Sequence, residues 1–306
     1  MLGAITGDII GSIYEFNNIK TKKIDLFTDK NRFTDDTVMT LAVAETLMNG
    51  GKLEDYIPTM VKFGKDYMNK ISALSLGWWI IRNKPPKPYK PYCSSRTSPV
   101  IWLSPHGWIT KLSEPFEEGL KLTEELTKSS AEVTNNDPEA IRGAQATAAS
   151  IFFMRHGKSK NAIEEYKDKL KDYIQKRFEY NLNFTLEEIH PNYLGTESQE
   201  SVPGAIISFL ESENFEDAIR NAVYLRDNEA LRKYKDYIFE NFPGVSMALD
   251  NSDLKNNTSS ITGSIAEAAY GIPEDIKNKA INYLDNRLKG VYENWINFLE
   301  SLGNKF

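Results

Sequence analysis

The sequence predicts an all-α protein, and three observations support this. Apolar residues recur at helical spacing along most of the 306-residue chain, alternating strand patterns are scarce, and several segments carry helix start and stop signals. Hydrophobic residues make up 41% of the chain and charged residues 26%, which allows a sizeable globular core. No internal repeat or clear linker interrupts the pattern. We therefore predict one domain over residues 1–306, which is long for one core but feasible.

The first helix with clear limits is predicted over residues 37–48, a mostly apolar run that ends at Asn49-Gly50-Gly51. A second begins at Asp137-Pro138-Glu139, where Asp is the cap, Pro takes the first helical position and Glu lies in the first turn. Its body, residues 140–153, is rich in small side chains. Because these let helices approach closely, we expect this helix at the centre of the bundle.

The remaining elements follow from the same patterns. Residues 201–210 and 261–270 are predicted to be two more central helices, whereas residues 215–223 and 276–288 are amphipathic and should lie outside. Residues 83–92 contain four prolines and cannot be helical. Residues 225–257 are charged and then polar, which predicts an irregular insertion between two core helices.

Composition excludes several classes of protein. A net charge of −6 with mixed signs argues against a nucleic-acid groove. The lone Cys93 permits no internal disulfide and suits a reducing compartment. The N-terminal segment lacks a basic region and carries Asp8 and Glu15 early, so it is not a signal peptide, and no run reaches the ~18 apolar residues of a membrane span. We expect a cytoplasmic protein without nucleic-acid or membrane partners, and leave its oligomeric state open.

The stretch RFTDDTVMT places Asp35 and Asp36 side by side after Thr34. One interpretation is structural: Thr34 caps a helix, and both carboxylates favour the positive end of its dipole. The other is a hard-cation site, because Mg²⁺ and Ca²⁺ prefer oxygen ligands and a divalent ion removes the repulsion between the carboxylates. The pair alone supplies too few ligands, so a further contributor is needed.

Asp8, Ser12 and Glu15 fall on one face of an otherwise apolar helical segment. The glycine spacing around Asp8 is only weak evidence for a phosphate loop, since no Lys-Ser/Thr follows. A carboxylate on a buried helix face needs a partner, because an unpaired buried charge is costly. A metal ion is one such partner.

Five segments, in order along nearly the whole chain, together resemble the ADP-ribosylglycohydrolase family: MLGAITGDIIGSIYEF, FTDDTVMT, AEVT with PEAIRGAQAT, SVPGAIISFLES with FEDAIRNAV, and ITGSIAEAAYGIP. The resemblance implies a compact orthogonal helical bundle around two divalent cations, Mg²⁺ or Mn²⁺. These bind the ribose of ADP-ribose while water cleaves its N- or O-glycosidic bond to a protein side chain or small acceptor. By position, Thr34, Asp35 and Asp36 match the first metal motif, Glu15 is the expected proton-handling residue, and Asp8 and Ser12 are expected near the substrate.

Two substrate motifs of the family are altered. Where relatives carry a G-N-G-x-x-M-R loop, this chain has residues 96–102, without the glycines and with Trp102 in place of the Arg. Trp102 either stacks on an adenine or belongs to the core. The T-H-N-H-P-E motif becomes residues 134–139 and loses both His side chains. Asn135 can still hydrogen-bond to substrate, whereas Asp137 is expected to be only a helix cap.

The second metal motif, G-G-D-x-D-T, is also damaged. Counting back from the helix at residue 261 without gaps gives residues 254–257, none of them acidic. A short insertion offers Asp250 or Asp253, and Asp253 better preserves the spacing, so we expect Asp253 to be the rebuilt ligand. If neither reaches the site, one metal loses its anionic ligands and binds weakly. The three His residues, His106, His156 and His190, have no partner at ligand spacing and are expected to be structural or on the surface.

Three functions remain open at this point. The first is a divergent metal-dependent ADP-ribosyl hydrolase. The second is a catalytically impaired relative that binds ADP-ribose, a nucleotide or an ADP-ribosylated partner. The third is a partner-blocking protein of the immunity type. Intact residues at 8, 15 and 34–36 favour the first, and the altered loops favour the second.

Overall fold

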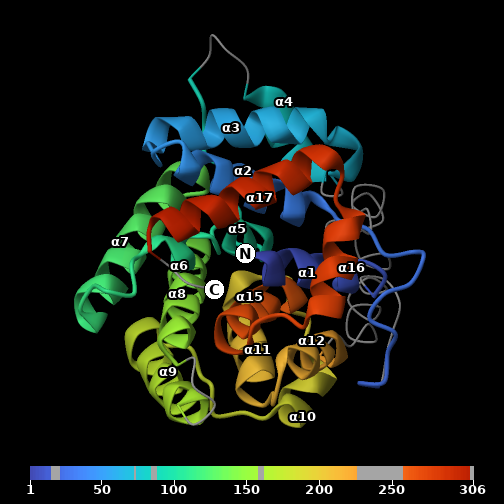
Figure 1. Cartoon of the computed structure of the whole chain (residues 1–306), viewed down its shortest axis with the longest axis vertical. Coiled ribbons are helices and arrows are strands. Elements are labelled where there is room, and N and C mark those ends of the chain that lie inside the picture. The colour runs from blue at the N-terminus through green and yellow to red at the C-terminus, as the bar shows by residue number, and fades with distance from the viewer. Residues whose placement is uncertain (15–20, 72–73, 84–87, 158–161, 226–257, 304–306) are drawn as a thin grey trace, which may run out of the picture.

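The computed structural model describes residues 1–14, 21–71, 74–83, 88–157, 162–225 and 258–303. Helices dominate all of these segments (Figure 1). Apart from one isolated bridge between Arg96 and Glu197, the described residues form no β-structure. The predicted all-α class is therefore confirmed.

With labels as in Figure 1, the first half of the chain contains α1 (Leu2–Gly11), α2 (Asp35–Met48), α3 (Leu53–Asp66), η1 (Met68–Lys70), α4 (Leu74–Arg82), α5 (Ser98–Trp102), α6 (His106–Ile109), α7 (Phe116–Thr134) and α8 (Pro138–His156). The second half contains α9 (Ile163–Phe178), α10 (Leu186–Ile189), η2 (His190–Asn192), α11 (Ser198–Leu210), α12 (Phe215–Tyr224), α15 (Thr258–Tyr270), α16 (Glu274–Tyr283) and α17 (Asn286–Ser301).

The centre of the molecule is the crossing of α1 and α15, which lie side by side in Figure 1. Glycines allow this approach: a Cβ on Gly3 would lie 2.0 Å from the carbonyl oxygen of Gly263, and one on Gly7 would lie 2.1 Å from that of Ser259. The Ser259 hydroxyl also donates to the Gly7 carbonyl at 2.8 Å. The glycine spacing near Asp8 therefore serves helix packing, and it fixes the position of the Asp8 backbone.

The other helices surround this crossing. α2 packs on α1, α3 and α17, while α8 packs on α7, α9, α11 and α15. Nearly every residue of α15 is buried, as is most of α8 from Gly143 onward. The predicted central positions of residues 140–153 and 261–270 are thus confirmed. None of the described helices is long and apolar enough to cross a bilayer.

The predicted element over residues 276–288 is wrong in its limits. The chain breaks after α16, and Asp285 caps α17 by accepting a hydrogen bond from the Leu288 amide at 3.0 Å. The N-cap Asp285 falls inside the amphipathic pattern, so the pattern alone does not show the break. Within the proline-rich stretch, residues 83 and 88–92 are non-helical as predicted. The predicted insertion lies, except for Leu225, outside the described residues.

Candidate functional site

The N-terminus of α2 brings together the residues of the TDD motif. Thr34 is the N-cap, and its side chain accepts a hydrogen bond from the Asp36 amide at 3.3 Å. Asp35 and Asp36 occupy the first turn and are fully buried, at 0% exposure. The structure thus realises the predicted cap, and it places both carboxylates where the helix dipole stabilises negative charge.

Asp8 reaches the same point from α1. Its Oδ1 accepts the Thr34 hydroxyl at 2.6 Å, and its Oδ2 accepts the Thr34 amide at 2.8 Å. Oδ2 also accepts the Thr37 hydroxyl at 2.6 Å and the Thr37 amide at 3.3 Å. Asp8 is therefore the anion that satisfies the first turn of α2 and fastens it to α1.

Aromatic side chains form the wall beside Asp36. The Trp102 indole is 1% exposed and donates from Nε1 to Asp36 Oδ1 at 3.2 Å. Its ring lies against Tyr92, with centroids 5.7 Å apart. Burial, together with the negative charge of Asp35, raises the pKa of the Tyr92 phenol, whose oxygen lies 2.7 Å from the Ser75 hydroxyl. Trp102 thus combines a core position with a direct contact to the motif.

Ser12 anchors the segment that leads into α2. Its hydroxyl donates to the Ile9 carbonyl at 2.7 Å and accepts the Arg32 amide at 3.1 Å. The Asn31 side chain donates to the same Ile9 carbonyl at 2.8 Å. These bonds hold the last turn of α1 against residues 31–32, two residues before Thr34.

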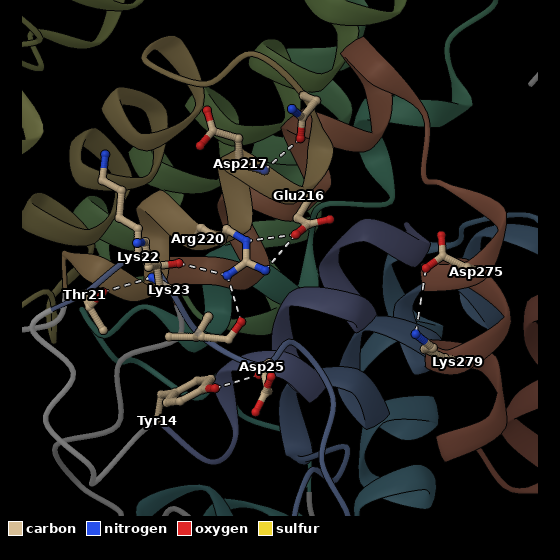
Figure 2. Close-up of polar contacts among 12 residues, drawn as sticks. Tyr14, Thr21, Lys22, Lys23, Asp25, Glu216, Asp217, Arg220, Asp275 and Lys279 are labelled. Atoms are coloured by element: carbon tan, nitrogen blue, oxygen red, sulfur yellow. Dashed lines mark hydrogen bonds and ion pairs between the residues drawn. The ribbon is translucent and has the colours of Figure 1, made fainter.

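The segment after residue 20 is also fastened (Figure 2). The Arg220 guanidinium on α12 donates to the carbonyls of Lys22 and Ile24 at 2.9 and 2.8 Å, and it pairs with Glu216 at 2.7 Å. The Tyr14 hydroxyl donates to the Asp25 carbonyl at 2.7 Å. The chain is therefore held on both sides of residues 15–20, the stretch that carries Glu15.

Asn135 holds a loop in place. Its side chain accepts the Ser94 amide and donates to the Ser94 carbonyl, both at 2.7 Å. Its backbone carbonyl accepts the Cys93 amide at 2.7 Å, and Cys93 and Asn136 both adopt positive φ, at 56° and 57°. The altered loop at residues 134–139 is thus bonded to the segment that leads into the altered loop at residues 96–102. Asp137 caps α8 through the amides of Glu139 and Ala140, which confirms the expected cap.

The histidines lie apart from this site. His106 is buried, with Nε2 at 3.0 Å from the Tyr56 hydroxyl and 2.9 Å from Ser130 Oγ, and burial lowers its pKa to about 4. His156 Nδ1 lies 2.9 Å from the Phe152 carbonyl oxygen, and the His190 ring stacks on the Tyr224 ring with the centroids 4.3 Å apart. All three histidine side chains hydrogen-bond to or stack on neighbouring protein groups.

The donor set at α2 fits a hard divalent cation in kind, since it consists of carboxylate and hydroxyl oxygens. It falls short in number: within the described ranges, no three His, Cys, Asp or Glu side chains are grouped to hold a metal. Two expected participants, Glu15 and Asp253, lie outside the described residues. The predicted roles at the site therefore stay predictions.

Two residues of this neighbourhood have no role in the sequence-based prediction. The Thr37 hydroxyl donates to Asp8. The sequence offers one indication of this, because Thr37 is the second hydroxyl residue that flanks the Asp pair. Tyr92 stands at the end of the proline-rich stretch, and no pattern in the sequence linked that stretch to the α2 N-terminus.

Comparisons with known proteins bear on the fold and the family of the chain. No curated protein sequence matches the chain. A solved structure described as an "ADP-ribosylglycohydrolase-related protein complex" superposes with a TM-score of 0.61 and 15% identity, covering 97% of each chain. At that identity the likeness concerns the fold. The family model for ADP-ribosylglycohydrolase matches residues 1–230, which include α1, the TDD motif and both altered loops. The chain therefore belongs to the ADP-ribosylglycohydrolase family.

Proposed function

We propose that this protein hydrolyses the glycosidic bond between ADP-ribose and an acceptor, with Mg²⁺ or Mn²⁺ bound at the N-terminus of α2. The observation that carries the proposal is the burial of Asp35 and Asp36 in one helical turn beside Asp8. The dipole of α2 favours negative charge at this point, and a divalent cation would offset the repulsion between the two neighbouring carboxylates. The family is generally metal-dependent, which agrees with this requirement.

The chain's own residues then take distinct parts. Thr34, Asp35 and Asp36 would hold the cation, with Asp253 as a further ligand, and the cation when bound would polarise water and the ribose oxygens. Asp8 and Ser12 keep the two elements of the site together through their contacts with Thr34 and Arg32. Glu15 would carry the proton that moves during hydrolysis.

A specific observation favours a second candidate, a relative that binds ADP-ribose or a nucleotide and hydrolyses slowly. Trp102 donates its indole N–H to Asp36, and the Asn135 side chain forms hydrogen bonds with the Ser94 backbone. In the G-N-G-x-x-M-R and T-H-N-H-P-E motifs these positions would face substrate. Loops that bind the substrate also position its scissile bond. Misplacing that bond by about 1 Å can lower the rate of hydrolysis on the order of 10²-fold.

The deciding experiment measures release of free ADP-ribose from ADP-ribosylated Arg and Ser peptides with Mg²⁺ or Mn²⁺. The hydrolase proposal expects turnover that Glu15→Gln abolishes. Calorimetry with ADP-ribose runs in parallel. Binding without release from either peptide, equal in the wild type and Glu15→Gln, would reject hydrolysis of these substrates and support the second candidate. Absence of both binding and release would reject both.

A further inference from the structure

Helix α4 carries an exposed apolar stripe. Leu74, Trp78 and Ile81 follow one another at spacings of four and three residues, so they share one face, and they are 49%, 57% and 44% exposed. The opposite face is buried: Leu76, Trp79 and Ile80 belong to the core. A helix anchored this firmly presents its outer stripe as a fixed surface. Clustered exposed apolar side chains of this size mark an interaction site.

Two cations lie at the C-terminal end of α4. The Arg82 guanidinium lies 5.6 Å from the centre of the Trp78 ring. Lys90 is exposed and fixed near the C-terminal end of α4, because its amide donates to Asn83 Oδ1 and its carbonyl accepts Trp79 Nε1, both at 2.7 Å. We call Leu74, Trp78, Ile81, Arg82 and Lys90 the α4 surface.

The surrounding chain is basic although the whole protein is acidic. Among the described residues between 62 and 96, Lys and Arg number six and acidic residues number one, Asp66, which pairs with Arg287 at 2.7 Å. The complete chain has a net charge of −6. This segment therefore differs in charge from the chain as a whole, and that charge favours an anionic occupant.

We propose that the α4 surface binds the anionic headgroup region of a lipid bilayer. Trp78 would lie at the level of the headgroups with Leu74 and Ile81 directed toward the acyl chains, while Arg82 and Lys90 contact lipid phosphates. Because Lys and Arg extend on long apolar stems, they reach the phosphates while their stems cover apolar surface. This contact is peripheral, since no described helix could cross the bilayer.

Two other occupants fit less well. Four of the six cations in this segment are Lys, a residue type depleted in protein–protein interfaces but common in segments that bind anionic lipid. A single-stranded nucleic acid would stack on aromatic rings, whereas two of the three stripe residues, Leu74 and Ile81, are aliphatic.

The α4 surface also stands close to the candidate site. Trp79, on the buried face of α4, packs against Tyr92 with ring centroids 5.9 Å apart. The Tyr92 ring in turn lies against Trp102, whose indole N–H donates to Asp36. Only α4 itself would therefore separate a bilayer on its outer stripe from the wall of the site. The lipid proposal itself does not depend on what that site does.

The test is co-sedimentation of the full-length chain with vesicles of phosphatidylcholine, with and without phosphatidylglycerol. We expect partitioning onto the anionic vesicles that weakens as salt is raised. Trp78→Ser/Leu74→Ser should lower the partition coefficient by at least about tenfold. Arg82→Gln/Lys90→Gln should lower it by roughly 25-fold, since each cation near an anionic surface contributes about fivefold. Phe184→Ser is the matched control: Phe184 is 49% exposed but lies outside the α4 surface, so this variant should bind like the wild type.

Circular dichroism confirms that each variant is folded before binding is compared. Equal binding to neutral and anionic vesicles, no partitioning of the wild type, or an equal loss in Phe184→Ser would each overturn the proposal. Binding to poly-L-glutamate or to single-stranded RNA through Arg82 and Lys90, without vesicle binding, would also overturn it. Those outcomes would assign the surface to an acidic protein or to a nucleic acid. None of these results alters the test of hydrolysis.

Discussion

Replacing Asp8 by Ala tests whether α1 holds the start of α2. In the native protein the Asp8 carboxylate accepts the amides and hydroxyls of Thr34 and Thr37 in a site that is 0% exposed. The variant removes this acceptor from all four donors. The Thr hydroxyls can rotate toward other oxygens, but the two backbone amides are fixed by the helix.

The magnitude follows from those two amides. A buried donor left without an acceptor costs about 1–3 kcal/mol, so the pair costs roughly 2–6 kcal/mol. The small cavity left by the carboxylate adds to this. We expect Asp8→Ala to lose roughly 3–6 kcal/mol of unfolding free energy, and Asp8→Asn, which keeps one oxygen acceptor, to lose less.

The assay is equilibrium urea unfolding followed by far-ultraviolet circular dichroism, with Asp137→Ala as the control. Asp137 also caps a helix, through the amides of Glu139 and Ala140, but it is partly exposed, so water replaces the lost acceptor. Its loss should cost about 1 kcal/mol. Equal losses in Asp8→Ala and Asp137→Ala would refute the assignment of Asp8 as the anion that fastens α2.

Three further predictions concern packing, pH and metal. Gly263→Ala should lower the free energy of unfolding by roughly 3 kcal/mol, because its Cβ would lie 2.2 Å from the Gly3 carbonyl oxygen and the backbones must separate; an unchanged melting temperature would contradict this. Burial lowers the pKa of His106 from 6.5 to about 4, so the unfolded chain binds the extra proton between these values. The free energy of unfolding should therefore keep its full value above pH 6.5 and fall by about 3 kcal/mol as the pH drops to 4. In the His106→Gln variant, unfolding measured as a function of pH should not show this decrease. Asp35→Ala/Asp36→Ala should abolish the calorimetric heat of Mg²⁺ binding, and heats equal to those of the wild type would count against a metal at α2.

Sequence alone settled the features that depend on local chemistry. Thr34 and Asp137 were predicted as helix caps, and both accept hydrogen bonds from amides in the first turn. The small-residue runs of α8 and α15 were predicted as central helices, because only small side chains permit close crossing. The break at Asp285 does not follow from the sequence pattern. Apolar residues keep their helical spacing on both sides of this N-cap, so two successive helices resemble one.

Tertiary structure alone decided how the site is connected. Nothing in the sequence showed that Asp8 accepts hydrogen bonds from Thr37, that Trp102 donates to Asp36, or that Asn135 is bonded to Ser94. These pairs are 29, 66 and 41 residues apart. The first two meet because α1 and α5 both pack on α2, and the third joins the C-cap of α7 to the segment before α5. Local patterns report the hydrogen bonds and apolar faces within one element. Which carboxylate meets which donor depends on how the helices pack, and packing is a property of the whole chain.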